Sequence, residues 1–172
     1  MSTLELKELS HPSGEVIKIA AGKTLDLKSQ GTTTLPTGSV VQVVSAVYTG
    51  GVGTTVVQPS YVDTGLTVSI TPSSSASKII VIANLSLETT GSTHGVHIRL
   101  VRGSTAIVYF AKYAGYYVPA IMGYGVDYLD SPNTTSPLTY KVQFAKGSSS
   151  SGSAYAQSNE STSTITLMEI QG

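Results

Sequence analysis

The chain has 172 residues, no cysteine, and equal numbers of basic and acidic side chains, so its net charge at pH 7 is zero. Only 12% of its residues are charged, which excludes the electrostatic attraction that holds proteins to nucleic acid or to anionic membranes. The lack of cysteine excludes disulfide bonds and thiolate metal sites, and no apolar run approaches transmembrane length. We therefore expect no nucleic-acid partner and no membrane insertion.

Residues 1–38 form a distinct N-terminal segment that holds much of the charge. Two short alternating pieces within it supply the apolar side chains that we single out as anchoring residues: Val16, Ile17, Ile19, Leu25 and Leu27. Strands this short cannot bury enough apolar area to be stable alone. The segment therefore predicts an extended arm with short strands that needs the head, sister chains or a host surface as its partner.

The head begins at Ser39 and shows strand patterns at the spacing of an all-β protein. The Tyr-rich stretch 114–130 fits either one strand with a loop or two short strands around Gly123. The other strands are predicted at 40–48, 66–71, 78–87, 95–102, 105–112, 138–145, 154–157 and 163–170. No segment has sustained helical periodicity, so we predict one β-sandwich head over 39–172, immunoglobulin-like or jelly-roll in type.

The stretch 63–87 organises the head, as a hairpin of two strands joined by a Pro/Ser turn. Apolar and polar residues alternate from Leu66 to Ile70, and Pro72 ends the first strand because proline cannot donate to a sheet. The second strand contains an unbroken apolar run at 79–83. Such a run is typical of a strand that is buried on both faces. We expect one face to pack on the chain's own second sheet and the other on a sister subunit.

Residues that could carry chemistry show no local pattern of a catalytic or metal site. His94 and His97 are three apart, which in a strand places them on opposite faces. Glycoside hydrolysis needs two carboxyl groups at a set separation, and no context selects a pair from the acids of the head: Asp63, Glu88, Asp127, Asp130, Glu160 and Glu169. We predict that the protein is not an enzyme and has no catalytic, cofactor-binding or metal site.

A cluster of tyrosines is the one feature that suggests a binding surface. Its members are Tyr109, Tyr113, Tyr116, Tyr117, Tyr124 and Tyr128. Tyrosine is amphipathic and loses little conformational entropy on contact, so it is favoured at interfaces and at sugar-binding surfaces. Our main interpretation is that these rings fill contacts between subunits. Recognition of a receptor or glycan and ordinary core packing are the alternatives.

With these stretches in view, the chain resembles small virion proteins of tailed bacteriophages, many of them from phages of marine bacteria and cyanobacteria. The resemblance covers nearly the whole chain and is most specific over DTGLTVSITPSS and the following SKI. It continues over LPTGSVVQVVSAVY, HIRLVRGSTAIV, LTYKVQFA and STITLMEI, and SGEVIKIAAGKTLDL is similar to fibre-type leader segments. It implies a trimer with a jelly-roll-like head.

The resemblance further implies a virion structural protein, assembled in the host cytoplasm. It would be a trimeric, short fibre-like appendage or a decoration protein, attached through its N-terminal arm. A capsid cement protein at threefold sites is the alternative placement. The implied partners are two sister chains, other virion proteins (capsid, portal or tail) and a host surface glycan. A soluble carbohydrate-binding module, which would be a monomer, is the alternative from another class.

Overall fold

The computed structural model describes residues 21–22, 35–90, 95–114, 120–149 and 151–172. The chain divides into two compact units, Met1–Thr34 and Leu35–Gly172, and the described strands lie in the second. The predicted anchoring residues lie outside the described residues: Val16, Ile17, Ile19, Leu25 and Leu27.

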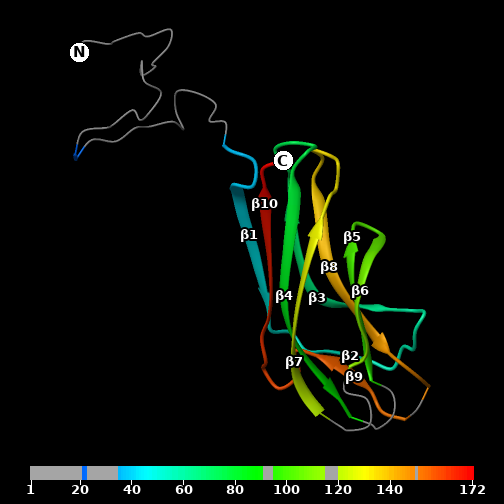
Figure 1. The fold of residues 1–172 in the computed structure, drawn as a ribbon. Helices are drawn as coiled ribbons and strands as arrows, with labels where there is room; N and C mark the ends of the chain where they lie inside the picture. The colour runs from blue at the N-terminus through cyan, green and yellow to red at the C-terminus, as the bar shows by residue number, and fades with distance from the viewer. Residues whose placement is uncertain (1–20, 23–34, 91–94, 115–119, 150) are drawn as a thin grey trace. The chain divides into compact units, whose positions relative to one another are not determined.

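The second unit is built from strands, and the described residues contain no helix (Figure 1). The strands are β1 (Val40–Tyr48), β2 (Val52–Thr54), β3 (Val62–Ile70), β4 (Lys78–Thr89), β5 (Val96–Arg102), β6 (Thr105–Ala114), β7 (Ala120–Asp130), β8 (Leu138–Lys146), β9 (Ala154–Ala156) and β10 (Ser163–Ile170). The predicted bounds of β1 and β10 are confirmed, and the Tyr-rich stretch contains one strand, β7, that runs through Gly123.

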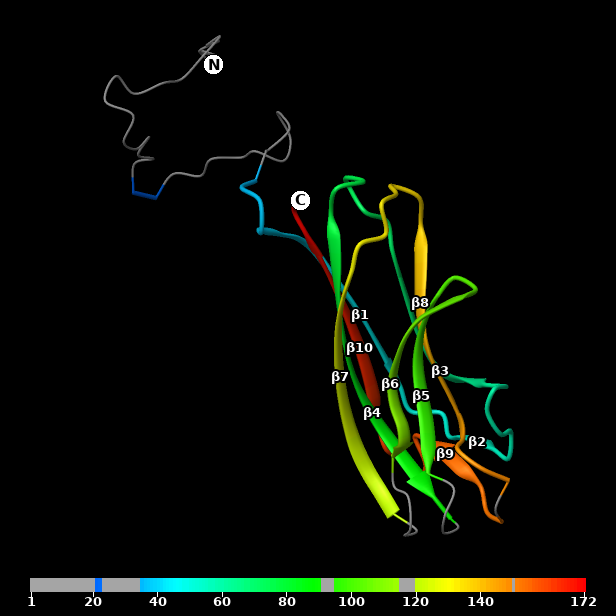
Figure 2. The same cartoon turned by 45° about the vertical axis from the view of Figure 1, so that its right-hand side comes forward.

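Two antiparallel sheets form a sandwich (Figure 2). The first has the order β1-β10-β4-β7, extended by the short strands β9 and β2, and the second has the order β3-β8-β5-β6. The long strands form nested antiparallel pairs: β1 with β10, β3 with β8, β4 with β7, and β5 with β6. A chain that folds as one long hairpin and then rolls up produces this nesting, which is the jelly roll. The predicted all-β, jelly-roll-like sandwich is confirmed.

The organising stretch is not a hairpin, contrary to the sequence prediction. β3 pairs with β8 in the second sheet, whereas β4 pairs with β10 and β7 in the first. The Pro/Ser turn therefore carries the chain from one sheet to the other. Such a crossover places the apolar faces of two consecutive strands opposite each other, where they can share one core.

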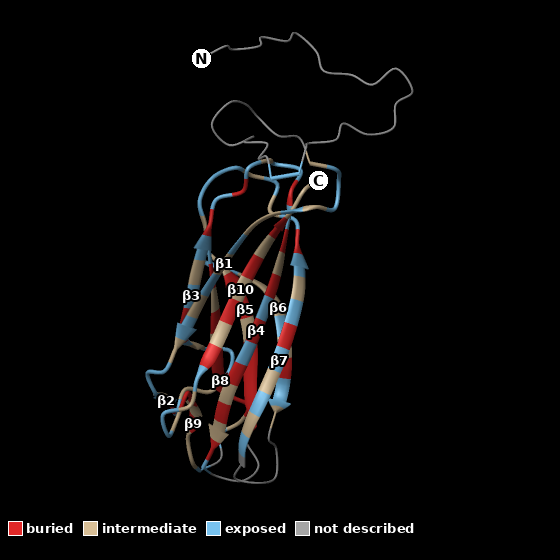
Figure 3. Ribbon diagram, turned by 90° about the vertical axis from the view of Figure 1, so that its left-hand side faces the viewer, coloured by how far each residue is buried: buried red, intermediate tan, exposed pale blue. Residues whose placement is uncertain are grey.

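Within the single chain β4 is buried on one face only, as expected for its contact with the second sheet, and the contact of its other face with a sister subunit stays a prediction. Ile79, Val81 and Ala83 are fully buried in the sandwich, whereas Ile80 is half-buried and Ile82 is 37% exposed. The alternation is visible along the ribbon (Figure 3). An apolar run is compatible with burial of both faces of a strand, but within a single chain of this fold the second sheet covers only the inner face of β4.

The core lies between the sheets. Leu87 and Leu167 enter it from the first sheet, and Leu66, Ile98 and Phe144 enter it from the second; all five are at most 1% exposed. The two layers therefore meet through large, interdigitating side chains, as sandwich packing requires. Each sheet keeps an outer face, and these two faces carry the candidate sites.

Candidate functional site

The outer face of the first sheet carries a row of apolar side chains across four strands. The strand register places Val43 of β1 beside Met168 of β10, Met168 beside Ile80 of β4, and Ile80 beside Leu129 of β7. Val43 is 53% and Leu129 is 51% exposed. A ladder of this kind normally faces a protein core, because opposed apolar pairs stabilise a sheet only when they are shielded from water.

Further apolar residues lie on the same side of the sheet, some of them separated from this row by polar positions such as Thr166 and Asp127. We define the outer apolar face as Val40, Val43, Val47, Ile80, Ile82, Ile121, Leu129, Met168 and Ile170. A hollow of about 350 Å³ is lined by the apolar Ile80, Leu129 and Ile170, by the cationic Lys78, and by four further residues: Thr37, Gly38, Gln171 and Gly172. Exposed apolar residues gathered on one sheet face beside a hollow are typical of sites where a second protein binds.

The outer face of the second sheet is polar by contrast. Asp63 of β3 accepts hydrogen bonds from Lys141 Nζ at 2.9 Å and from Gln143 Nε2 at 2.5 Å. Gln143 Oε1 in turn accepts from Arg99 Nε at 2.8 Å. Burial raises the pKa of Asp63, but these hydrogen bonds and the nearby cations outweigh it, so the pKa lies below the ordinary value. This face is suited to water or to a polar ligand.

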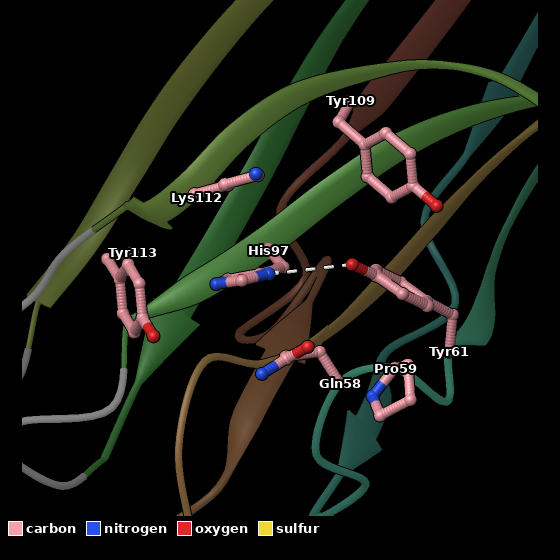
Figure 4. A pocket seen from close by; sticks show the side chains of 7 residues that line it. All are labelled: Gln58, Pro59, Tyr61, His97, Tyr109, Lys112 and Tyr113. Carbon is pink, nitrogen blue, oxygen red and sulfur yellow. Dashed lines mark hydrogen bonds between the residues drawn. The ribbon is translucent and has the colours of Figure 1, made fainter.

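An aromatic pocket of about 400 Å³ lies at the end of this polar face (Figure 4). Its aromatic lining consists of Tyr61, which precedes β3, His97 of β5, and Tyr109 and Tyr113 of β6. The described residues that complete the lining are Gln58, Pro59 and Lys112. We call these seven residues the aromatic pocket.

The rings of the pocket are held by mutual contacts. The Tyr61 ring lies 6.1 Å from that of Tyr109, and the Arg99 guanidinium carbon stands 3.9 Å from the Tyr61 centroid, a cation–π distance. The Tyr61 hydroxyl is 3.4 Å from Nδ1 of His97, and the His97 ring meets the Tyr113 ring edge-on at 4.8 Å. The pocket wall is therefore formed before any ligand arrives.

Electrostatics keep His97 neutral and the pocket positive. Burial and the charge of Lys112 hold the pKa of His97 below its ordinary value. Burial and the neighbouring Tyr109 raise the pKa of Tyr61, against the opposing effect of Arg99. Lys112 is the cationic residue among the described residues of the pocket lining, and Arg99 stands outside the lining, against the Tyr61 ring.

Local irregularities of the β5–β6 hairpin shape the pocket. The register shifts between Val96 and Ile98, where β6 contains the extra residue that places Lys112 and Tyr113. Tyr113 has a φ of 61°, in the left-handed region that side chains rarely adopt. Gly95 faces it closely, since a Cβ on Gly95 would lie 2.5 Å from the Tyr113 Cα. Bulges of this kind re-aim side chains next to functional sites.

The structure divides the predicted tyrosine cluster. Tyr109 and Tyr113 line the aromatic pocket and are 51% and 44% exposed. Tyr124 and Tyr128 lie on the inner face of β7, half-buried against the core, and the Tyr124 hydroxyl donates to the Phe110 carbonyl at 3.5 Å. The remaining two lie outside the described residues: Tyr116 and Tyr117.

Sequence reasoning missed several members of the aromatic pocket. Tyr61 precedes the organising stretch and carries no motif. The sequence analysis considered His97 only together with His94, which lies outside the described residues, and rejected the pair as a metal site. Within the part of the chain that the structure describes, no group of three His, Asp or Glu residues could hold a metal ion. No helix there is long and apolar enough to cross a membrane.

Comparisons with known proteins found likeness only among solved structures. No protein-family model and no curated protein match the chain. The chain is similar to structures of infectious bursal disease virus: the VP2 subviral particle (10% identity, TM-score 0.45), the Gt strain (14%, 0.42) and the derived T=1 particles (12%, 0.39). The alignments cover 87% of this chain and 42%, 42% and 41% of the matched chains. The chain therefore spans less than half the length of the proteins that it matches.

Proposed function

We propose that the chain is a virion structural protein whose heads assemble into a trimer through the outer apolar face. The observation that carries this proposal is the row of Val43, Met168, Ile80 and Leu129 across the outer side of the first sheet. The role is mechanical, because burial of this face would hold the sister chains together. Residues 1–38 then tie the trimer to the particle.

The lack of net charge on the chain and the exposure of this apolar face both support assembly. Free proteins in solution generally rely on surface charge for solubility, and this chain has no net charge. The outer apolar face, in contrast, leaves Val47 64% and Ile121 62% exposed. Covering apolar surface releases roughly 25 cal/mol per Å², so contact with sister chains both stabilises the head and removes its least soluble part.

The fold agrees with this role by analogy. Jelly rolls occur in viral shells and also in lectins, and a fold alone does not assign a function. The phage-like sequence resemblance favours the first of these settings. Trimer symmetry rests on that resemblance, whereas the choice of the interacting face rests on the exposed side chains.

Two placements on the particle fit the proposal. In one, the trimer is a short fibre-like appendage whose outward loops reach the host, as the leader-like segment of residues 1–38 favours. In the other, it is a decoration or cement protein that clamps neighbouring capsid subunits at threefold sites, as the short length favours. Imaging virions with a label on Gly172 separates them, because the label lies over the capsid faces in the second case and at the tail or a vertex in the first.

Sedimentation of the purified full chain tests the assembly. We expect the wild type to sediment at three times the chain mass of 17.8 kDa. Leu129→Lys places a charge in the apolar row and should yield single chains, because a buried unpaired charge costs several kcal/mol. Thr139→Lys, an exposed position on the second sheet, is the matched control and should remain a trimer.

Two outcomes would contradict the proposal. A wild-type chain that stays single at high concentration would remove the assembly itself and favour the soluble carbohydrate-binding module. A trimer that survives Leu129→Lys but dissociates with Thr139→Lys would move the interface to the other sheet.

A further inference from the structure

We propose that the aromatic pocket binds a saccharide that carries a carboxylate group. The pocket lies on the second sheet, whereas the outer apolar face lies on the first. The two sites therefore face away from each other across the sandwich. Saccharide binding does not depend on the proposed assembly, and either can fail without the other.

The size and lining of the pocket fit a ligand of one or two sugar rings. Its volume of about 400 Å³ lies in the range of small-molecule sites, which combine aromatic walls with a few convergent polar groups. Tyr109 and Tyr113 keep about half of their surface in water. A tyrosine ring offers a flat face to the C–H groups of a sugar and a hydroxyl to its oxygens.

The backbone of β6 is distorted in order to place one of these rings. Tyr113 adopts φ 61°, a conformation that costs an L-residue free energy. The extra residue in the β5–β6 register lies at the same point. β6 is also the edge strand of its sheet, a position where bulges are common. Strain that directs an aromatic ring toward a cavity is typical of a functional site.

A buried polar atom points to a missing hydrogen-bond partner. His97 is 5% exposed, and its Nε2 has no hydrogen-bond partner among the described residues. Nδ1 faces the Tyr61 hydroxyl, while Nε2 points to the other side of the ring, toward Tyr113 (Figure 4). When Tyr61 donates to Nδ1, Nε2 carries the proton and can donate. Unpaired buried donors are rare because each one destabilises the protein. Nε2 is covered and the Tyr113 ring stands edge-on beside it, so a sugar oxygen would reach it only after that ring turned away.

The charges of the pocket select an anion. Lys112 lines it and has no ion-pair partner in the described part of the chain, and Arg99 stands behind the Tyr61 ring. The described lining residues include no carboxylate. Asp63, a carboxylate on this face, is already engaged by Lys141 and Gln143. A sugar carboxylate placed beside Lys112 would balance the charge while its ring stacks on Tyr109.

The test measures the affinity of the full-length protein for immobilised oligosaccharides that contain uronic or sialic acids. Each oligosaccharide is paired with its methyl-esterified form. The ester keeps the shape of the sugar and removes its charge. We expect binding to at least one acidic oligosaccharide, at least about tenfold tighter than to its ester. Sodium sulfate at equal ionic strength should compete no better than sodium chloride, because the ring and the anion are recognised together.

Two variants and one control connect the binding to the pocket. Tyr109→Ala should weaken binding to the acidic form about tenfold or more, and Lys112→Gln should abolish the preference for the acid over the ester. Thr139→Ala, an exposed change elsewhere on the same sheet face, should leave both unchanged. Both pocket side chains are exposed, so circular dichroism should show that all three variants remain folded.

The proposal is overturned if no acidic oligosaccharide binds more tightly to the wild type than to Tyr109→Ala. It is also overturned if acid and ester bind equally to the wild type, or if sulfate displaces the sugar as a specific competitor. The Leu129→Lys variant, which is expected to be a single chain, should still bind the acidic oligosaccharide. Loss of this binding would contradict a site that lies within one subunit.

Discussion

At the scale of single residues, Asp130 is the side chain whose role is hardest to see in the sequence. It lies before Ser-Pro, a context typical of a turn, yet it is only 6% exposed at the end of β7. Its Oδ2 accepts from Arg102 Nη1 and from the Tyr140 hydroxyl, both at 2.6 Å. Burial and the bond to Asp130 raise the pKa of Tyr140, so this tyrosine stays protonated. One carboxylate of the first sheet thus holds two side chains of the second.

This arrangement predicts a large effect of a small change. Asp130→Asn removes the charge and leaves Arg102 without its partner, so we expect the free energy of unfolding to fall by about 2–4 kcal/mol. Urea denaturation measures the loss. Asp127→Asn, an exposed position on the same strand, should change stability by no more than about 0.5 kcal/mol. Equal effects of the two substitutions would show that the buried contacts do not stabilise the sandwich.

Residue identity alone predicted only part of the candidate site. Tyr109 and Tyr113 could be found because they belong to an unusual local cluster. Tyr61 could not, because its contact with His97 joins residues 36 apart in the chain and depends on the order β3-β8-β5-β6. Side chains from different strands meet according to sheet order, and no local pattern encodes that order.

At the scale of elements, Glu169 fastens the crossover between β3 and β4 to β10. It is fully buried, and its carboxylate accepts from Gln42 Nε2 at 2.6 Å and from the Ser73 amide and hydroxyl, both at 2.7 Å. Burial raises its pKa, but the hydrogen bonds from Ser73 and Gln42 outweigh burial and hold the pKa below the ordinary value. The turn that carries the chain between the sheets is therefore held by one ionised group.

A lowered folded-state pKa makes this contribution dependent on pH. The folded state binds the proton less readily than the unfolded one, so the stabilisation is complete above the ordinary glutamate pKa of about 4.3 and is lost as the pH falls through the lower folded value. We expect Glu169→Gln to cost about 2 kcal/mol at pH 7 and clearly less at pH 3. Urea denaturation of both proteins at the two pH values measures this difference.

The exposed Glu160 provides the control for that series. Glu160→Gln removes a carboxylate that is already solvated, so it should leave stability nearly unchanged at both pH values. A stability difference between wild type and Glu169→Gln that does not shrink on acidification would mean that the ionised form is not what holds the crossover.

Most elements could be predicted from the sequence, but their partners could not. Alternation and turn residues located β1, β8 and β10 almost to the residue, because those signals act over a few positions. The same signals suggested a hairpin for β3 and β4, which lie in different sheets. The Pro/Ser turn is compatible with either arrangement, and the choice is made by the rolling of the whole chain into nested pairs.

At the scale of the whole molecule, the two outer faces of the sandwich differ in chemical character. The first sheet presents apolar side chains and the second presents charges and the aromatic pocket. If sister chains cover the first face, the second remains in water and is available to a ligand. Assembly and recognition can therefore occur together on one small head, with no residue shared between them.

The division of the chain predicts that residues 35–172 fold without the preceding arm. Their core is contained within Leu35–Gly172, and the start of β1 is fastened locally, by hydrogen bonds from the Gly38 amide to the Gln171 carbonyl and from the Gln171 amide to the Ser39 carbonyl, both 2.8 Å. A chain that begins at residue 35 keeps all of these contacts. Thermal unfolding should therefore show the same midpoint as the full chain, and sedimentation the same trimer.

The proposed role of residues 1–38 sets the other half of this prediction. A virus that supplies only residues 35–172 should make particles that lack the protein, because in the proposed arrangement the arm provides the attachment and the head provides the trimer. Quantifying the protein in purified virions measures this. A truncated chain that joins the virion as well as the full one would place the attachment on the head, and one that fails to fold would show that the arm contributes to the core.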